Sequence, residues 1–335
     1  MSLNNRLKSR EILLLLFGSN NMLPVHRTLC ALLFASCGSG TFAATQESDT
    51  SKVKVIYLNA KKTVLREVGT LPKILKEASG LTYTTSKHFW SHNDDGIPAL
   101  YCLDSVGNQL RAVQLNIQNR GWEDLAQDES GNVYIGGFGN NKNDKKELRI
   151  YKVKDLERVN TAVVQPEIIT YKYGDQKEFP PPPGIKNFDA DAFIAYRGAL
   201  LLFTKNRTSP FTGYSKIYKL SQQPGEHVAE VIDSLFVGKG PMMNNWITGA
   251  AISPDQKTIA LLFHNRIWLI RNFKENKISA GTIYQIDLHH YSHKAGVSFK
   301  GNDTLYIVDE LELDLIGGKL YTVDLKPFMK QIKAH

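Results

Sequence analysis

Apolar and polar positions alternate along most of this chain in short runs, which is the pattern of half-buried β-strands. Clear examples are Val133–Ile135, Leu200–Phe203 and Thr258–Leu262. Turn residues separate such runs, as in Ser130-Gly131-Asn132 and Pro254-Asp255-Gln256. Helical periodicity is confined to the first 35 residues, so the remainder of the chain is predicted to be all-β.

The predicted strands fall into five similar units. Each unit opens on an acidic or small polar pair, and a polar cluster ends its second strand about 15 residues later. Counted from residues 77, 123, 191, 250 and 295, successive units lie 46, 68, 59 and 45 residues apart. Four strands per unit at this spacing are typical of a β-propeller. Five four-stranded blades are therefore predicted, and six is the alternative if 53–58 begins another blade.

The fifth unit supplies only three strands, the last of them at Lys319–Val323. The N-terminal run Val64–Val68 is predicted to complete this blade as its outer strand. A ring closed by strands from both ends of the chain has no open edge between its first and last blades. Unbroken repetition also predicts one domain over residues 44–335.

The first 43 residues have the pattern of a targeting segment. The apolar run Ile12–Phe17 is too short to span a bilayer, and Met22 is an alternative start of the protein. A weakly basic opening, the apolar stretch Leu29–Ala35 and small residues up to Ala43 then predict a secretory signal peptide in residues 1–43.

A second interpretation of the same segment stays open. The stretch Phe34–Cys37 resembles a relaxed bacterial lipobox, in which Cys37 becomes the lipidated N-terminus, whereas ordinary cleavage would follow Ala43. Both predict an exported protein, which is periplasmic, secreted or an outer-membrane lipoprotein. A lipid on Cys37 is the one membrane attachment predicted.

Charge and cysteine content narrow the possible partners. The net charge is +8, and residues outside 1–43 include 37 basic against 32 acidic side chains, which are scattered along the chain. A nucleic-acid-binding protein would show a basic stripe interleaved with aromatic residues, so no nucleic-acid partner is predicted. Cys102 is the single cysteine beyond the signal region, which excludes an internal disulfide and a metal motif built on cysteine.

Polar side chains at the strand ends are expected to meet. In a propeller blade the innermost strand borders the channel and the second strand runs antiparallel to it, so the start of one lies beside the end of the other. Radial symmetry then gathers all five sets around one channel mouth. The ligand-binding candidates are Glu77, His92, Asn93, Asp94, Glu123, Asp124, Asp189, Asp191, Lys205, His264, Asp309 and Glu310. Trp246 is a further candidate to line this opening, and the other tryptophans are expected to pack within blades.

Converging carboxylates indicate two kinds of chemistry. Glu77, Glu123 and Asp191 are candidate Ca²⁺ ligands, because oxygen ligands suit hard cations. A carboxylate and a histidine can also act as general base and acid once burial shifts their pKa values. A structural role for Glu77 and Glu123 stays equally open, since an acid at a strand start can accept backbone N–H bonds from the next blade. The sequence has no Gly-x-Ser-x-Gly motif, so it leaves open whether the protein is an enzyme.

Several stretches resemble one family of exported bacterial β-propellers, whose members are labelled phytase-like esterase or SdiA-regulated proteins. The stretches are Glu77–Leu81 with Trp90–Asp94, Gly121–Ala126, Ile135–Asn141, Asn187–Ala192, Phe203–Asn206, Thr248–Ala250 with Ser253–Asp255, and Val308–Glu310. The resemblance spans about residues 70–325. It implies a β-propeller and, loosely, a Ca²⁺-assisted hydrolase.

The chain departs from that family pattern in the acidic ring. Gly137 and Ala251 stand where relatives have Asp, Ala295 stands where they have Glu, and Asp191 replaces a Glu. The resemblance therefore implies a weakened ring. Three functions stay open at this point: binding of a small polar ligand or peptide at the channel mouth, Ca²⁺-assisted hydrolysis of esters or phosphoesters, and a non-catalytic interaction scaffold.

Overall fold

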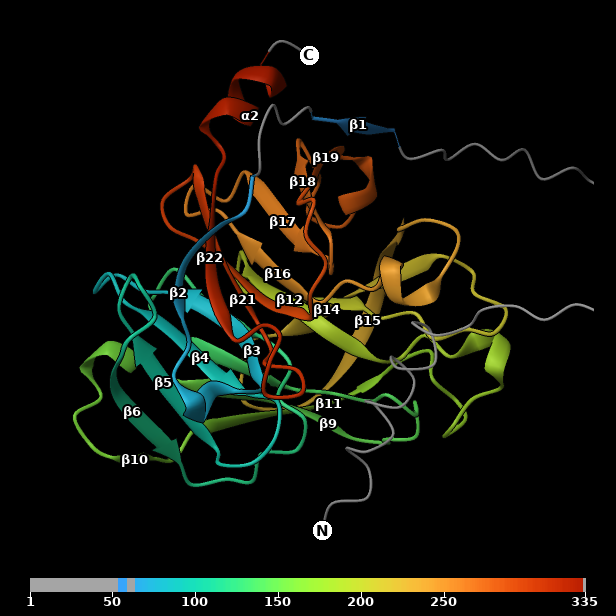
Figure 1. The fold of residues 1–335 in the computed structure, drawn as a ribbon. Helices are drawn as coiled ribbons and strands as arrows, with labels where there is room; N and C mark the ends of the chain where they lie inside the picture. Colours follow the sequence, from blue (N-terminus) through green and yellow to red (C-terminus); the bar gives the residue numbers. More distant parts are fainter. Residues whose placement is uncertain (1–53, 59–63, 334–335) are drawn as a thin grey trace, which may run out of the picture. The chain divides into compact units, whose positions relative to one another are not determined.

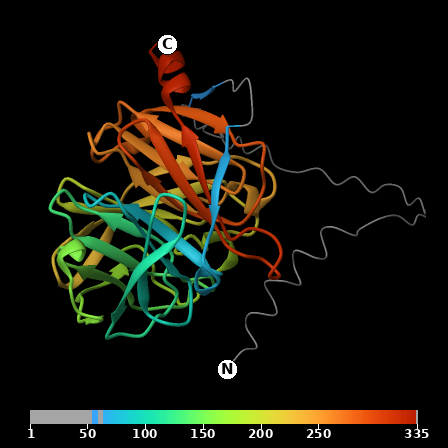
Figure 2. The same cartoon turned by 60° about the vertical axis from the view of Figure 1, so that its left-hand side comes forward.

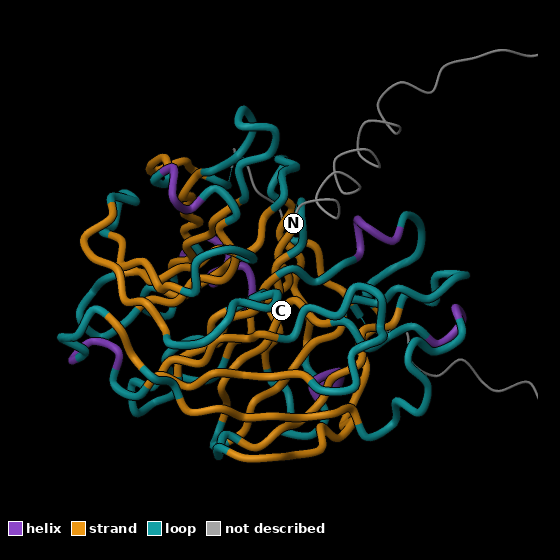
Figure 3. Tube along the Cα trace, turned by 90° about the horizontal axis from the view of Figure 1, so that it is seen from below, coloured by secondary structure: helices purple, strands orange, loops and turns teal. Residues whose placement is uncertain are grey.

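Strands make up nearly all of the regular structure, as the orange segments of Figure 3 show. The computed structural model describes residues 54–58 and 64–333. The strands in this part of the chain are β1 (Val55–Tyr57), β2 (Arg66–Thr70), β3 (Ala78–Tyr83), β4 (Phe89–Asn93), β5 (Ala99–Leu103), β6 (Gln109–Leu115), β7 (Leu125–Gln127), β8 (Val133–Gly137), β9 (Leu148–Val153), β10 (Val163–Val164), β11 (Glu167–Tyr173), β12 (Ala190–Tyr196), β13 (Ala199–Thr204), β14 (Tyr214–Ser221), β15 (Gly225–Phe236), β16 (Gly249–Ile252), β17 (Thr258–Leu262), β18 (Arg266–Arg271), β19 (Thr282–Asp287), β20 (Lys294–Phe299), β21 (Thr304–Asp309) and β22 (Lys319–Asp324).

Helical structure in the described residues is limited to short pieces. The α-helix is α2 (Lys326–Ile332), and the 3₁₀ turns are η1 (Lys73–Leu75), η2 (Leu156–Arg158), η3 (Pro183–Ile185), η4 (Met242–Asn245) and η5 (Ile278–Ala280). No helix among residues 54–58 and 64–333 has the length and apolarity needed to cross a membrane. The predicted signal region, with Met22 and Cys37, lies outside the described residues.

The sheets contain five sets of four strands in the described part of the chain. The sets are β3-β4-β5-β6, β7-β8-β9-β11, β12-β13-β14-β15, β16-β17-β18-β19, and β20-β21-β22 with β2. The second and third sets merge into one eight-stranded sheet, because their outer strands β11 and β15 pair in parallel. Strand β1 joins the outer edge of the fourth set and does not start a sixth. The grouping is consistent with the predicted five blades.

The innermost strands form a closed ring. Strand β3 packs beside β7, β7 beside β12, β12 beside β16, β16 beside β20, and β20 beside β3. The N-terminal strand β2 pairs antiparallel with β22 and completes the fifth set, two residues later than the predicted run Val64–Val68. Blue β2 lies beside red β22 in Figures 1 and 2. Closure by strands from both ends of the chain is confirmed.

Turn residues account for the tight hairpins between inner strands. Between β7 and β8, the Asp128 carboxylate accepts hydrogen bonds from the backbone N–H of Ser130 (3.0 Å) and of Asn132 (2.9 Å). Between β12 and β13, Arg197 and Gly198 both have positive φ, at 47° and 80°. This is the conformation of a type I′ turn, whose twist matches that of the flanking strands.

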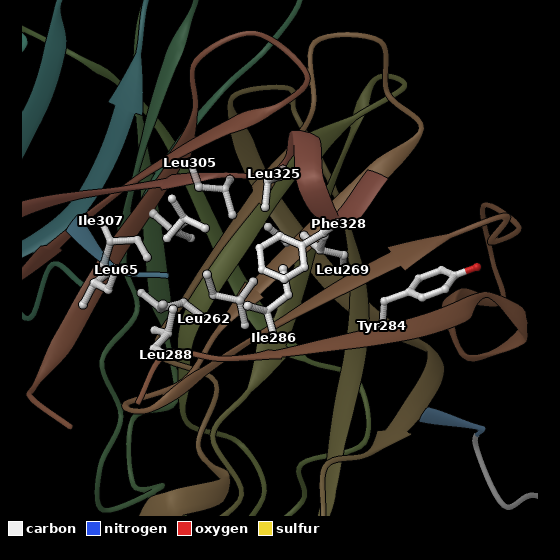
Figure 4. Packing of buried hydrophobic residues seen from close by; sticks show 14 of the residues in the cluster. Leu65, Leu262, Leu269, Tyr284, Ile286, Leu288, Leu305, Ile307, Leu325 and Phe328 are labelled. Carbon is white, nitrogen blue, oxygen red and sulfur yellow. The ribbon is translucent and has the colours of Figure 1, made fainter. Parts of the chain in front are cut away.

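Apolar side chains fill the spaces between neighbouring blades. Each of the five interfaces holds its own cluster of buried residues in the described part of the chain. The cluster between the fourth and fifth blades also takes Leu65, from the segment before β2, and Phe328 from α2 (Figure 4). These packed interfaces fix the inner strands and therefore position the residues at their ends.

Candidate functional site

The pairing register places equivalent residues of the five blades around the channel. One set lines a common cavity: Leu81, Leu125, Phe193, Ala250 and Val297. We call these residues the floor ring. The residues two positions earlier form the inner ring: Ser79, Glu123, Asp191, Thr248 and Ala295. The residues four positions earlier form the outer ring: Glu77, Gly121, Asp189, Trp246 and His293.

The ends of the second strands add a further set. Each floor-ring residue pairs with one residue on the second strand of its own blade. The residue three positions after that partner, along the second strand, lies toward the same face of the propeller as the inner and outer rings. These residues form the partner ring: Asp94, Phe138, Lys205, His264 and Glu310. The inner, outer and partner rings together are called the charged mouth below.

This register corrects the sequence alignment of the repeats in two places. Ser79, and not Glu77, is equivalent to Glu123, and its hydroxyl donates a hydrogen bond to the Glu123 carbonyl (2.7 Å). Thr248, and not Ala250, is the fourth member. Register shifts in the β3–β4 and β12–β13 ladders insert an extra residue on the inner strand. Such bulges have no marker in the spacing of the repeats.

Two ion pairs link the first and second strands of the third blade. The Lys205 ammonium contacts the Asp191 carboxylate, and each residue is only 7% exposed. The Arg207 guanidinium donates to Asp189 Oδ2 (Nε to Oδ2, 2.5 Å). Asp189 Oδ1 also accepts the backbone N–H of Asn140 (2.7 Å) and so ties the second blade to the third.

The indole ring of Trp246 packs against both cationic side chains, Lys205 and Arg207. The Lys205 Nζ lies 4.9 Å from the centroid of the indole ring and the Arg207 Cζ lies 4.6 Å from it, which are cation–π distances. The indole N–H donates to the backbone carbonyl of Asn206 (2.8 Å), which fixes the ring. The half-buried Trp246 therefore belongs to the mouth.

Glu123 is the carboxyl group most affected by its surroundings. Burial, and next the negative charges of Asp191 and Asp94, raise its pKa well above the usual range, and Lys205 only partly opposes them. A Cβ at Gly139 would lie 2.0 Å from Glu123 Oε1, so the glycine makes room for the carboxyl group. The surroundings of Glu123 therefore favour the neutral carboxyl group over the carboxylate.

A histidine and a carboxylate face this cluster from the fifth blade. His293 Nδ1 lies 3.1 Å from Glu310 Oε2 and 3.6 Å from Glu312 Oε1. Burial lowers the pKa of His293, but the Glu310 carboxylate outweighs burial and the net shift is upward. His293 was not predicted from the sequence, because the aligned position in that repeat was Ala295.

His264 is the buried neighbour of His293. The two ring centroids are 5.3 Å apart, and the His264 Nδ1 lies 3.3 Å from the hydroxyl of Tyr291. Burial, and next the charge of His293, lower the pKa of His264 to about 2. Its Nε2 is buried and lacks a hydrogen-bond partner among the described residues. His264 is therefore a neutral acceptor or donor beside the charged groups.

Lys294 holds this part of the mouth in place. Its side chain is fully buried, and Nζ donates to the His264 carbonyl and to the Ser292 hydroxyl, both at 3.0 Å. Burial lowers its pKa to about 8. These bonds connect the end of β17 to the segment that carries His293.

His92 does not reach the mouth as the sequence suggested. It is fully buried, its ring packs edge-on against Trp122 at 5.5 Å, and its Nδ1 lies 3.1 Å from the Asn93 carbonyl. Burial lowers its pKa to about 4. A residue without solvent contact cannot touch a ligand in this conformation.

Two more of the predicted site residues form hydrogen bonds with backbone groups. Asn93 accepts the N–H of Glu77 (3.1 Å) and donates to the Ile74 carbonyl (2.7 Å). Asp309 accepts the N–H of Lys319 (2.8 Å) and the hydroxyl of Tyr321 (3.0 Å). Both side chains stabilise the chain around the mouth and are buried.

Asp124 carries out the locking role that the sequence allowed for Glu77 and Glu123. Its carboxylate is fully buried and accepts the backbone N–H of Leu125 (2.8 Å), Ala250 (3.1 Å) and Phe193 (3.2 Å). These donors belong to the second, fourth and third blades. Burial raises the pKa of Asp124, and the three N–H donors oppose this shift.

The residues predicted to hold Ca²⁺ do not fit a metal ion. Within residues 54–58 and 64–333, no group of three or more His, Cys, Asp or Glu side chains is arranged to hold one. Glu77 belongs to a different ring from Glu123 and Asp191. Lys205 already pairs with Asp191, and burial disfavours the ionised form of Glu123. These groups therefore offer a ligand hydrogen bonds and buried charges.

Comparison with known proteins adds little about activity. No protein-family model matches this chain, and no curated protein matches it either. Similar solved structures include a catalytically inactive virginiamycin B lyase from Staphylococcus aureus, at 13% identity and TM-score 0.37, covering 76% of this chain and 68% of the other. A gluconolactonase from Xanthomonas campestris is 12% identical with TM-score 0.40 and coverages of 74% and 72%.

An aldose sugar dehydrogenase from Streptomyces coelicolor, with PQQ bound, is 10% identical with TM-score 0.43 and coverages of 80% and 99%. These three β-propeller proteins differ in activity, and their likeness to this chain is too slight to carry an argument about function. The arrangement of its own sheets shows that the chain is a β-propeller. Its function therefore has to be inferred from the residues of its charged mouth.

Proposed function

We propose that this protein is a binding propeller whose charged mouth takes a small polar ligand or a peptide that carries a cationic group. One observation carries the proposal: the partly buried carboxyl group of Glu123 lies among the negative charges of Asp191 and Asp94. These surroundings raise its pKa, and a cation that arrives beside it would stabilise the ionised form.

The charge of the mouth supports the same ligand class. Its carboxyl groups outnumber the cations Lys205, within the mouth, and Arg207, next to it, and both of these cations already contact carboxylates. The carboxyl groups are Glu77, Asp94, Glu123, Asp189, Asp191 and Glu310. An ammonium or guanidinium group is complementary to this set, whereas an anionic ligand would be repelled.

The N-terminal sequence supports an exported location for this binding activity. A signal peptide in residues 1–43 would place the propeller in the periplasm or outside the cell, and a lipid on Cys37 would hold it at a membrane. We propose a secreted or periplasmic binding protein for small cationic molecules or peptides on this basis.

A second candidate function has one observation in its favour. The contact between His293 and Glu310 gives the mouth a histidine with a raised pKa, and Glu123, whose pKa is also raised, lies in the same mouth. Such groups can act as general base and general acid in ester hydrolysis. This activity would appear as turnover of a cationic ester that is lost in His293→Gln, and a wild-type protein that turns over none of a panel of such esters would exclude it.

The binding function is tested with a panel of small amines and guanidines, each matched to a neutral amide of the same shape. Cationic members are expected to bind, and Glu123→Gln should weaken them about tenfold, because it removes a charge-assisted hydrogen bond. Glu226→Gln, an exposed change on the outer strand β15, is the control. Equal binding of neutral and cationic members would contradict the ligand class, and no binding by any member would favour a non-catalytic scaffold.

A further inference from the structure

A cavity lies at the opposite end of the channel from the charged mouth. Its volume is about 440 Å³, within the range of small-molecule sites. All five inner strands line it, with residues from the second half of each strand and from the following turns. The set includes Thr82–Thr85, Ala126–Glu129, Ile194 and Ala195, Ala251–Pro254, and Ser298 and Phe299.

This cavity is separate from the charged mouth. The floor ring closes it at the bottom, and the Asp124 carboxylate bonds to the N–H groups of the floor-ring residues Leu125, Phe193 and Ala250. The charges of Asp191 and Lys205 lie beyond that carboxylate, among the inner and partner rings. A molecule that enters the cavity therefore stops at the floor and cannot continue to the mouth.

The walls of the cavity offer neutral hydrogen-bonding groups. Each inner strand is the edge of its four-stranded set and turns its unpaired backbone edge toward the channel. The amide nitrogen of Gln127 is buried at this cavity and has no hydrogen-bond partner among the described residues. Thr85 and Ser298 add hydroxyl groups, and Tyr83 adds a half-buried aromatic ring.

The charge and the composition of the cavity lining restrict the chemical class of the ligand further. The charged residues that line the cavity are Asp128 and Glu129, so the lining holds no cation to receive an anion. Asp128 already accepts bonds from Asn132 and Tyr134. The floor-ring side chains pack between the blades, and Ala251 and Ile252 add partly exposed apolar groups to the lining. A suitable ligand is therefore neutral, rich in hydroxyl groups and partly apolar.

We propose that this cavity is a second ligand site, which binds a neutral carbohydrate unit through the Gln127 amide and the exposed edges of the inner strands. Carbohydrates combine ring hydroxyl groups with apolar C–H faces, which matches a lining of backbone edges, polar side chains and small apolar side chains. Because the floor is closed, the cavity accepts a free sugar or the end of a glycan chain, and it excludes units in the middle of a chain.

The test uses saturation-transfer NMR on the whole protein with neutral methyl glycosides at millimolar concentration. Their phosphorylated counterparts serve as the anionic comparison. Neutral glycosides should receive saturation and phosphorylated ones should not. Gln127→Leu should weaken binding about tenfold, because it removes the unpaired amide donor of this side chain at nearly constant volume. Gln127→Glu should fail to restore it, since a carboxylate has no N–H to donate.

Matched controls separate the two ends of the channel. Glu123→Gln changes the charged mouth and should leave glycoside binding unchanged, and the melting temperature checks that every variant is folded. An oligosaccharide blocked at both ends distinguishes a chain-end site from a site for internal units and should not bind. The proposal is overturned if no neutral glycoside receives saturation, or if Glu123→Gln abolishes the signal while Gln127→Leu leaves it intact.

Discussion

The two ends of the channel are built from the same five inner strands, and they differ in almost every other property. At one end the strand starts carry carboxylates, lysine, arginine and histidines, packed so closely that the side chains of Asp191 and Lys205 are each 9% exposed. At the other end the same strands surround an open cavity of about 440 Å³ lined by small, apolar and neutral polar residues.

This difference follows from where the strands point. The inner strands start at the charged mouth, so the connections entering them and the ends of the second strands bring long polar side chains to that face. The other end is formed by tight hairpins such as the one at Arg197–Gly198, which leave the channel wide. Asp124 lies between the two regions and keeps them apart.

The largest effect is expected at the charged mouth from Lys205→Met. This change leaves the Asp191 carboxylate buried without its cation, which should reduce the free energy of unfolding by about 4 kcal/mol. Urea denaturation measures it. The double variant Lys205→Met with Asp191→Leu removes both charges and should recover most of the loss. A single variant as stable as the wild type would show that the pair is not buried in solution.

Acid should destabilise the region behind the mouth. His92 has a pKa of about 4 in the folded protein against about 6.5 when unfolded, so below pH 6.5 the unfolded chain takes up a proton that the folded chain does not. The stabilisation is complete above pH 6.5 and is lost as the pH falls toward 4, which amounts to about 3 kcal/mol.

The carboxyl groups Glu123 and Asp124 shift in the opposite direction and partly mask this effect. The measurement is therefore the difference between the wild type and His92→Phe in unfolding free energy, followed from pH 7 to pH 4. The variant should lose less stability over this range than the wild type. Parallel curves for the two proteins would mean that His92 titrates normally and is exposed.

The boundary between the two ends is tested by Asp124→Ala. This change leaves three backbone N–H donors without their acceptor, and it should destabilise the protein by about 2 kcal/mol, since water from the adjacent cavity can satisfy part of the loss. Asp124→Asn keeps one acceptor oxygen and should cost roughly half as much. If Asp124→Ala has no more effect than the exposed change Asp144→Asn, the carboxylate does not hold the blades together.

The smallest effect is expected at the cavity end. Gln127→Leu removes a buried donor that has no partner, so the free energy of unfolding should stay within about 0.5 kcal/mol of the wild type. Thermal denaturation in parallel with Lys205→Met compares the two ends directly. A large loss in Gln127→Leu would reveal a structural bond for this amide.

The repeated features of the fold could be predicted from the sequence. Strand pattern and spacing were sufficient for the all-β propeller and for its closure by the N-terminal strand, because these depend on alternation and on the avoidance of open edges. The convergence of Glu123, Asp191 and Lys205 also followed from strand starts and ends.

The features that could not be predicted from the sequence depend on single-residue shifts in strand register and on how deeply a side chain is buried. The bulge at Ser79 moved Glu77 out of the inner ring, and the same kind of offset hid His293 in the outer ring. His92 and Asp309 look polar and accessible in the sequence, yet neighbouring blades bury both. The cavity has no motif at all, since small residues and backbone edges create it.

The most direct test of the charged mouth is a ¹³C NMR titration of its carboxyl groups, in the wild type and in Glu123→Gln. Glu123 should give a carboxyl resonance that titrates well above the usual range of a glutamate and is missing from the variant, whereas the high-titrating resonance of Asp124 should remain. A bound amine should move the pKa of Glu123 downward. If every carboxyl group in the wild type titrates in its ordinary range, Glu123 is solvated and separate from Asp191, and the proposed cation site has no physical basis.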